Sequence, residues 1–185
     1  CDDTINQFWS KKDKIFYDTA ESNDLIIRPK GFFDPMIPNS AAIAAQNSYK
    51  CYRFTNDENY LKIVGESMKS VSNLIDKSPL DLPSWFKLYY LMEEQNTEIF
   101  ISGDTREIFY KDSLRTLLSS YMPNTIIISK DTNNPDFYLP IMEGRNQDEK
   151  NKVYVCQNYV CDLPIDNLDS LKKKINELSG AYLSK

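Results

Sequence analysis

The sequence predicts a mixed fold of the α+β / α/β class, built from two parts. A helical part extends to about residue 96, and a small three-stranded, mainly parallel α/β part covers 97–185. Before residue 97, apolar residues recur at three- and four-residue spacing in long segments, which is the helical period. After it, short β-branched runs alternate with a helical segment, the order expected of a βαβ unit. With 185 residues, of which 41% are hydrophobic, the chain is long enough for one or two packed domains.

The first elements lie before residue 40. Residues 1–9 resemble the end of an amphipathic helix, with Ile5, Phe8 and Trp9 on one face. Two strand-like runs, 15–18 and 25–28, are separated by turn-forming residues and predict a short β-hairpin near 15–28. A loop rich in proline and in apolar side chains follows, and loops of this kind often shape a pocket.

Three helices are predicted next, over 40–54, 59–76 and 83–94. Asn39 or Ser40 supplies a cap at the start of the first helix, and Asn56-Asp57 separates it from the second. The short connections predict antiparallel helix hairpins.

The part from residue 97 begins with an apolar strand and a helix, and ends with a helix that Gly180 closes. Gly103-Asp104 predicts a tight strand-to-helix turn; the alternative is a phosphate-binding turn, although one glycine is far short of the known phosphate-binding motifs. The predicted strands are 98–102, 125–129 and 153–156, and the predicted helices are 107–121, 136–143 (short) and 168–178.

Composition excludes several classes of function. The net charge is −5, from 22 Lys and Arg against 27 Asp and Glu, which argues against a nucleic-acid partner. The chain has no histidine, which removes His-based catalysis and His-ligated metal sites. No apolar run is long enough to predict a transmembrane segment. We therefore predict no metal, no cofactor and a cytoplasmic protein.

The cysteines are too few for a disulfide scaffold. Cys156 and Cys161 flank a four-residue turn, which predicts a Cα–Cα separation of about 4.5–5.5 Å. They form either two buried thiols, which we expect, or a disulfide; the spacing fits neither a C-x-x-C redox motif nor a zinc site. Cys1 allows an alternative, since a mature bacterial lipoprotein also begins with cysteine.

A polar cluster in the segment before residue 40 is the candidate site. It contains Asp18, Thr19, Arg28 and Asp34, beside several phenylalanines. Carboxylates beside aromatic rings are typical of sugar-handling sites, where Asp18 and Asp34 would be the catalytic candidates. The alternative is a structural Arg–Asp pair in an ordered loop.

Two separated motifs resemble the thioredoxin-domain-containing, spermatogenesis-associated (YyaL-like) family. The first combines Phe16-Tyr-Asp-Thr-Ala20, Leu25-Ile-Ile-Arg-Pro-Lys30 and Asp34-x-x-x-Pro38 before a helix. The second combines Tyr154-Val-Cys156 with Cys161-Asp-Leu-Pro164. The chain departs from the family's P-S-G-N-S at Pro38-Asn39-Ser40-Ala41-Ala42, where two alanines remove hydrogen-bonding side chains.

The resemblance implies that the chain is a C-terminal portion of a longer protein. Residues 1–96 would be the last helices of an (α/α)6 toroid, and the partners would be the rest of that toroid, a thioredoxin-like domain or a second copy. The toroid implies a carbohydrate ligand and a chain that is not catalytic alone. Asp18, Thr19, Arg28 and Asp34 match the family and are the site residues carried over.

An incomplete toroid would leave apolar helix faces uncovered. The residues expected to be exposed are Tyr49, Tyr52, Trp85, Tyr89 and Tyr90. The alternatives to this interpretation are an autonomous interaction module or membrane-tethered lipoprotein domain, and a small sugar-active hydrolase or epimerase-like enzyme.

Overall fold

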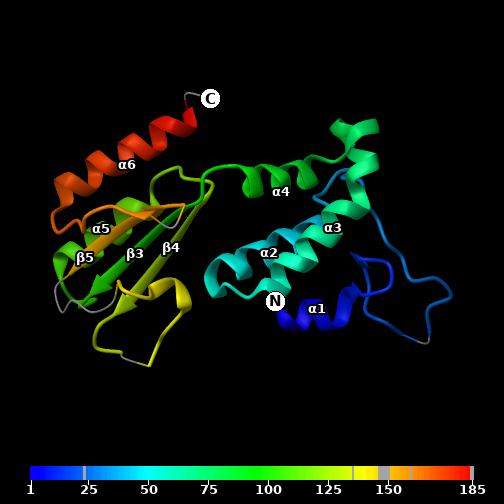
Figure 1. The fold of residues 1–185 in the computed structure, drawn as a ribbon, viewed down its shortest axis with the longest axis horizontal. Helices are drawn as coiled ribbons and strands as arrows, with labels where there is room; N and C mark the ends of the chain where they lie inside the picture. Colours follow the sequence, from blue (N-terminus) through cyan, green and yellow to red (C-terminus); the bar gives the residue numbers. More distant parts are fainter. Residues whose placement is uncertain (23, 135, 146–150, 159, 184–185) are drawn as a thin grey trace. The chain divides into compact units, whose positions relative to one another are not determined.

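The fold is taken from a computed structural model that describes residues 1–22, 24–134, 136–145, 151–158 and 160–183. The chain forms two compact units, 1–93 and 94–185 (Figure 1). Helices combine with a two-stranded and a four-stranded sheet, which confirms the α+β / α/β class.

The three predicted helices of the first unit are confirmed to within two residues at each end. Asn39 caps α2, because its side-chain oxygen accepts a hydrogen bond from the Ala42 amide at 3.0 Å. Asn56 ends the same helix in the left-handed conformation, with a φ of 55°. The unit comprises α1 (Asp2–Phe8), β1 (Trp9–Ser10), β2 (Ile15–Phe16), α2 (Ser40–Thr55), α3 (Glu58–Lys77), η1 (Pro79–Asp81) and α4 (Pro83–Glu93).

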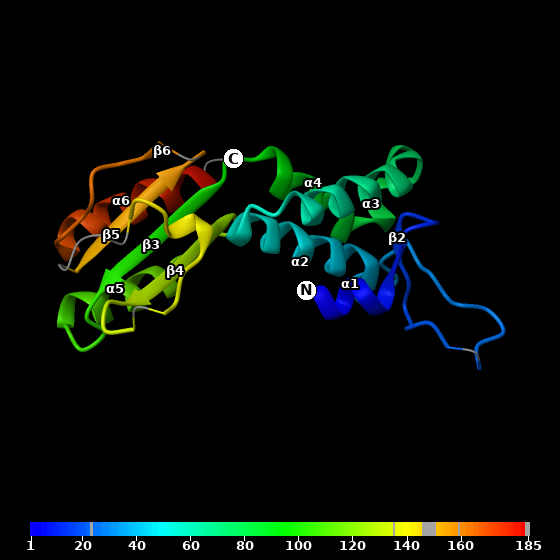
Figure 2. The same cartoon turned by 60° about the horizontal axis from the view of Figure 1, so that its bottom comes forward.

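The predicted hairpin near 15–28 is wrong in its pairing. β2 pairs antiparallel with β1, Trp9 opposite Phe16, through a turn in which Lys14 takes a positive φ of 59°. The run 25–28 forms no strand, and its Ile26 side chain is 99% exposed. The described residues around 24–28 instead lie in a loop that extends away from the helices (Figure 2). Phe32 and Asp34, later in the same segment, contact α4.

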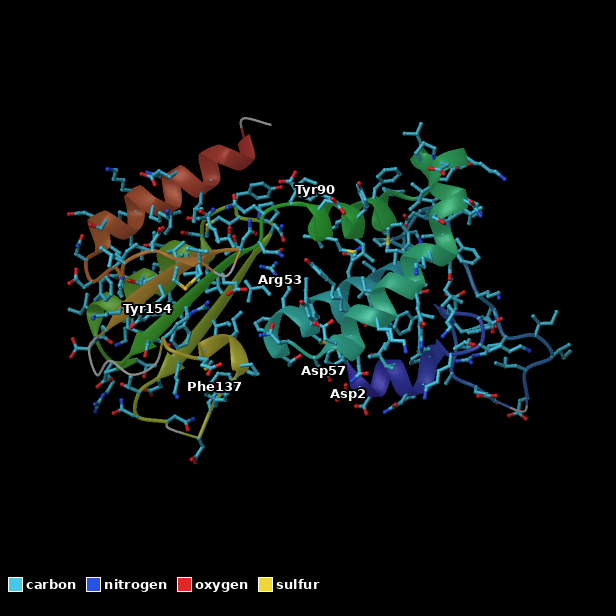
Figure 3. The ribbon with its side chains drawn as sticks, in the orientation of Figure 1. Asp2, Arg53, Asp57, Tyr90, Phe137 and Tyr154 are labelled. Atoms are coloured by element: carbon cyan, nitrogen blue, oxygen red, sulfur yellow. A yellow bond between two sulfur atoms is a disulfide. The ribbon has the colours of Figure 1, made fainter. Side chains whose placement is uncertain are left out.

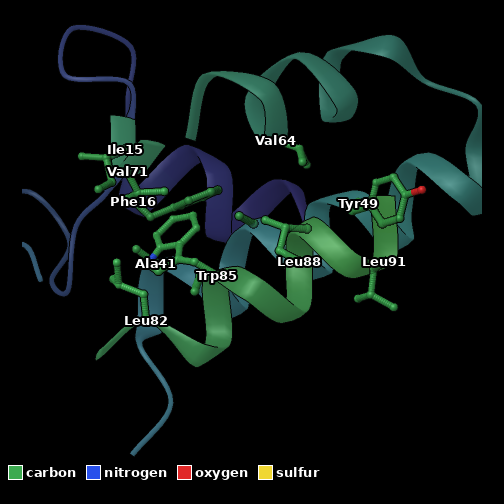
Figure 4. Packing of buried hydrophobic residues seen from close by; sticks show 12 residues of the cluster. Ile15, Phe16, Ala41, Tyr49, Val64, Val71, Leu82, Trp85, Leu88 and Leu91 are labelled. Atoms are coloured by element: carbon green, nitrogen blue, oxygen red, sulfur yellow. The ribbon is translucent and has the colours of Figure 1, made fainter. Parts of the chain in front are cut away.

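The core of the first unit is built around Trp85, which is fully buried (Figure 4). The alanines of α2 allow its backbone to come close to α4, and Ile15 and Phe16 of β2 close one end of the cluster. Ile5 and Phe8 of α1 and Trp9 of β1 pack against this core, as the predicted apolar face requires.

The expected set of exposed aromatic residues is partly wrong. Tyr89 and Tyr90 are exposed, at 51% and 38%. Trp85 and Tyr49 are buried, at 0% and 4%, because the helices of this unit cover them, and Tyr52 is half-buried.

The second unit contains a four-stranded sheet in the order β4-β3-β5-β6. Only β3 and β4 are parallel, while β5 and β6 are antiparallel to their neighbours, so the prediction of three mainly parallel strands is wrong. The unit comprises β3 (Thr97–Gly103), α5 (Ile108–Leu118), β4 (Thr125–Asp131), η2 (Pro140–Met142), β5 (Lys152–Gln157), β6 (Val160–Cys161) and α6 (Leu168–Leu183).

Two helix predictions in this unit need correction. The short helix expected over 136–143 is a single 3-10 turn, Pro140–Met142, so no crossover helix returns the chain to a parallel position in the described part of this connection. The last helix does not end at Gly180 but continues to Leu183.

The helices α5 and α6 cover one face of this sheet. Ile99, Ile101, Val153 and Val155 point from the strands into the cluster that these helices form. On the other face, Glu98 forms an ion pair with Arg145 at 3.2 Å, and both side chains are largely buried.

Candidate functional site

The two candidate carboxylates lie at the same place, the N-terminal end of α2. Asp34 accepts a hydrogen bond from the Asn39 amide with Oδ1 and from the Ser84 amide with Oδ2, the latter at 2.8 Å. It therefore joins the starts of α2 and α4, and each of its oxygens is occupied by a backbone donor. Asp34 thus has the contacts of a structural anchor.

Asp18 is the more available of the two carboxylates. Its Oδ1 accepts a hydrogen bond from the Ser40 hydroxyl at the first residue of α2, and its side chain is exposed. Its Oδ2 faces Gly31, and within the described residues no donor contacts that oxygen. Asp18 therefore retains an acceptor for a ligand hydroxyl.

Arg28 and Thr19 make contacts that hold the loop between β2 and α2. The Arg28 guanidinium donates to the carbonyls of Thr19 (3.0 Å) and Gln7 (2.9 Å) and stacks over the Tyr17 ring at 4.3 Å. The Thr19 hydroxyl is buried, and the described part of the chain gives it no hydrogen-bond partner. Arg28 thus connects the loop to α1 and has no contact with either candidate carboxylate among those that the structure describes.

Sequence reasoning missed the group around Asp13. Its carboxylate accepts hydrogen bonds from the hydroxyls of Tyr17 (2.8 Å) and Ser10 (2.9 Å) and lies 3.7 Å from the Lys30 ammonium. The Tyr17 hydrogen bond is the largest of these causes, and together they hold the pKa of Asp13 below its usual range. The sequence offers no signal for this group beyond the closeness of these residues along the chain.

Two hollows lie beside the candidate carboxylates, one next to Asp18 and one next to Asp34. The first, of about 190 Å³, has aromatic walls and polar groups at its rim, and is lined by Thr4, Phe8, Phe16, Tyr17, Asp18, Ser40 and Ala44. The second, of about 380 Å³, is mostly apolar and is lined by Asp34, Pro35, Met36, Ile37, Pro38, Pro83, Ser84 and Lys87. The first combines one carboxylate, Asp18, with aromatic side chains.

The cysteines form two disulfides. Cys156 and Cys161 face each other across β5 and β6 and are bonded, so the favoured interpretation as thiols is wrong. Their Cα atoms are 3.9 Å apart, closer than the predicted range. Cys1 is bonded to Cys51 and joins α1 to α2, a pairing that the sequence analysis missed because 50 residues separate the two.

The turn after β3 is a tight connection, as predicted. A Cβ atom on Gly103 would lie 1.6 Å from Asn151 Oδ1, so the close approach of the chains requires glycine. Arg106 hydrogen-bonds to the Asp104 carboxylate and holds its pKa well below the usual range. These contacts are internal to the turn.

Two further observations bear on the class of site. Among the described residues, no three Cys, Asp or Glu side chains are grouped so that they could hold a metal ion. None of the described helices is both long and apolar enough to cross a membrane.

The chain is similar to curated proteins along nearly its whole length. It is 23% identical to spermatogenesis-associated protein 20 of Mus musculus over 180 residues, which is 90% of this chain and 23% of the mouse protein. The Homo sapiens protein of the same name is also 23% identical, over 89% of this chain and 23% of its own length. An uncharacterized protein of Caenorhabditis elegans is 19% identical over 92% of this chain and 24% of its own.

The chain thus spans about a quarter of the length of these relatives. No family model matches it, and no solved structure matches it either. The matches confirm the resemblance inferred from the two sequence motifs: this chain is similar to the spermatogenesis-associated protein 20 family.

Proposed function

We propose that this chain is one portion of a longer protein of the spermatogenesis-associated protein 20 type, and that it supplies one wall of a carbohydrate-binding pocket. In this proposal the helices of residues 1–93 are the last helices of an (α/α)6 toroid. The observation that carries it is the hollow beside the start of α2, where Asp18 lies among aromatic side chains.

The chemistry of this hollow suits a sugar. Phe8 and Tyr17, which are half-buried, offer apolar ring surface for the C–H face of a pyranose, and the buried Phe16 supports them from behind. Arg28 covers one face of the Tyr17 ring, so a sugar would use the rest of that ring. Oδ2 of Asp18 and the Thr4 hydroxyl offer hydrogen-bonding groups for sugar hydroxyls at the rim. Such convergence of a few polar groups on an apolar surface is the usual composition of a small-molecule site.

The same geometry argues against catalysis by this chain alone. Glycoside hydrolysis uses two carboxyl groups, one on each side of the bond. Asp34 has both oxygens occupied by backbone amides, which leaves Asp18 alone. The hollow holds about 190 Å³, whereas small-molecule sites occupy roughly 300–1,000 Å³. The rest of the pocket would come from the longer protein.

The proposal is tested by titrating the 185-residue chain with hexoses and disaccharides while recording amide NMR spectra. We expect shifts confined to the lining residues, with a dissociation constant on the order of 1 mM, since only part of the site is present. Asp18→Asn should weaken binding about tenfold, the usual scale for losing a hydrogen bond to a charged group.

Asp76→Asn is the matched control, because Asp76 is exposed near the end of α3 and lines neither hollow. Absence of shifts at saturating sugar, or equal binding by the Asp18 variant, would contradict the proposal.

The exposed apolar residues of the loop favour a second role, as an interaction surface. Ile26, Ile27, Met36 and Ile37 are between 73% and 99% exposed, and exposed apolar groups of this size mark contact surfaces. We propose that the rest of the longer protein covers them. Replacement of Ile26 and Met36 by serine in the longer protein should then loosen its packing, as measured by limited proteolysis between the two portions; unchanged cleavage would contradict this.

The lipoprotein alternative makes a separate prediction at Cys1. A lipid thioether and the disulfide to Cys51 require the same sulfur atom. Intact mass measurement of the non-reduced protein therefore separates the two: a mass two hydrogens below that of the reduced chain for each disulfide, or an added diacylglycerol.

A further inference from the structure

A second cavity in the first unit is distinct from the hollow beside Asp18. It has a volume of about 380 Å³, which lies within the range of small-molecule sites. It is formed by α1, the β1–β2 turn and one face of α3, and is lined by Ile5, Trp9, Lys11, Lys14, Asn59, Lys62, Ile63 and Glu66.

The lining of this cavity carries an excess of positive charge. Three of the lining residues are lysines and one is a glutamate, although the chain as a whole has a net charge of −5. Glu66 is paired with Lys14 at 2.9 Å. Within the described residues, Lys11 and Lys62 have neither an ion pair nor a hydrogen bond to a side chain. Two ammonium groups from separate elements are therefore free to meet an anion.

Three acidic side chains near this cavity accept hydrogen bonds from residues other than the cavity lysines. Asp2 accepts a hydrogen bond from the Tyr60 hydroxyl, and Asp57 caps the first turn of α3 through the Asn59 amide. Both carboxylates are labelled in Figure 3, and neither lines the cavity. Asp13, in the β1–β2 turn, is held by Tyr17 and Ser10. These hydrogen bonds leave the three carboxylates charged, but among the described contacts none of them forms an ion pair with Lys11 or Lys62.

The cavity also has an aromatic wall. The Trp9 indole is half-buried and held against Phe16, with ring centroids 5.0 Å apart, by the β1–β2 pairing. Ile5 and Ile63 are half-buried beside the cavity as well. A ring placed against this surface would be desolvated on one side while its charged substituent met the lysines.

We infer that this cavity binds a small phosphomonoester carried on a sugar or similar ring. The phosphoryl group would lie between Lys11 and Lys62, and the ring would rest on Trp9. A phosphomonoester carries a charge of about −1.5 to −2 at neutral pH, which matches two unpaired ammonium groups better than a single carboxylate does. Lysine is a regular phosphate ligand, acting as a point charge. The inference does not depend on the Asp18 pocket.

The test is a calorimetric titration of the chain with glucose 6-phosphate, glucose and inorganic phosphate in parallel. We expect glucose 6-phosphate to bind at least tenfold more tightly than either of the others, and the affinity to fall with rising salt. Lys11→Gln and Lys62→Gln should each weaken binding about tenfold. Lys77→Gln, at the far end of α3 and outside the cavity, is the matched control and should change nothing.

Trp9 supplies a second readout. The chain has two tryptophans, and Trp85 is fully buried, so a ligand-induced change in emission would report on Trp9. Trp9→Phe should abolish this change while keeping the affinity within a few fold, because a ring remains. Asp18→Asn should leave glucose 6-phosphate binding unaltered, which separates this inference from the proposed function.

Three results would overturn the inference. The first is no binding of glucose 6-phosphate at millimolar concentration. The second is binding that both lysine variants retain in full. The third is tighter binding of a polyglutamate peptide than of glucose 6-phosphate, which would assign the cavity to an acidic peptide.

Discussion

Replacement of Asp34 distinguishes a structural carboxylate from a catalytic one. The Asp34 carboxylate accepts hydrogen bonds from two backbone amides. One belongs to Asn39, which caps α2, and the other to Ser84, in the first turn of α4. Asp34→Ala removes both acceptors at once and leaves two amides at helix starts without their partner.

The expected cost follows from these two bonds. A hydrogen bond to a charged group contributes about 1.5–3 kcal/mol, so two of them give roughly 3–6 kcal/mol. Because Asp34 is only half-buried, water can replace part of this, and we expect a loss of about 3 kcal/mol for Asp34→Ala. Asp34→Asn keeps one acceptor oxygen but turns an amide group toward the second N–H, and should cost about 2 kcal/mol.

Urea unfolding followed by tryptophan fluorescence measures this cost directly. Both tryptophans, Trp9 and Trp85, lie in the unit of residues 1–93, so the signal reports that unit. With a slope near 1 kcal/mol per molar urea, a loss of about 3 kcal/mol should lower the midpoint by about 3 M for Asp34→Ala. Asp76→Ala, on an exposed position of α3, is the control and should stay within about 0.5 kcal/mol. An Asp34→Ala chain as stable as the parent would refute the structural assignment and restore Asp34 as a catalytic candidate.

Three other predictions concern single contacts. Loss of the α1–α2 disulfide, which closes a loop of 50 residues, should cost about 4 kcal/mol by chain entropy, against about 2 kcal/mol for the β5–β6 disulfide; urea unfolding of the serine variants checks both. The hydrogen bond to Asp2 raises the pKa of Tyr60 to about 12. The stabilising effect of this hydrogen bond is therefore complete below pH 10 and is lost between pH 10 and 12. Carbon-13 NMR of the Tyr60 ring should show a lower pKa in Asp2→Asn. Arg145→Met should destabilise the second unit by about 3 kcal/mol, and adding Glu98→Gln should recover part of that loss in thermal unfolding, because a lone buried charge is worse than none.

Helices were predictable because their signals are local. The ends of α2 follow from two asparagines. The Asn39 side chain accepts a hydrogen bond from the Ala42 amide at the start of the helix, and the Asn56 backbone ends it in the left-handed conformation. Strand pairing is not local. The run 25–28 has the composition of a strand, but β2 finds a partner in the residues that precede it, and the run is left exposed. Likewise, β5 returns antiparallel to β3 after a connection whose described part holds only a 3-10 turn, a feature that the spacing of apolar residues did not reveal.

At the candidate site, too, the sequence predicted which residues lie close together but not the partners that each side chain contacts. The sequence placed Asp18 and Asp34 together, and both do lie at the start of α2, yet their partners differ: one meets a side-chain hydroxyl and the other two backbone amides. Every residue type except proline has a backbone amide, so no sequence motif predicts a hydrogen bond to one. The sequence therefore does not distinguish an aspartate that holds the backbone from an aspartate that takes part in catalysis. Once Asp34 is assigned to the anchor, the chain holds one available carboxylate at this place. Any two-carboxylate mechanism then requires a second group other than Asp34, which the proposed function assigns to a longer protein. The Asp34 and Asp18 variants, measured side by side for stability and for sugar binding, therefore decide the role of this site.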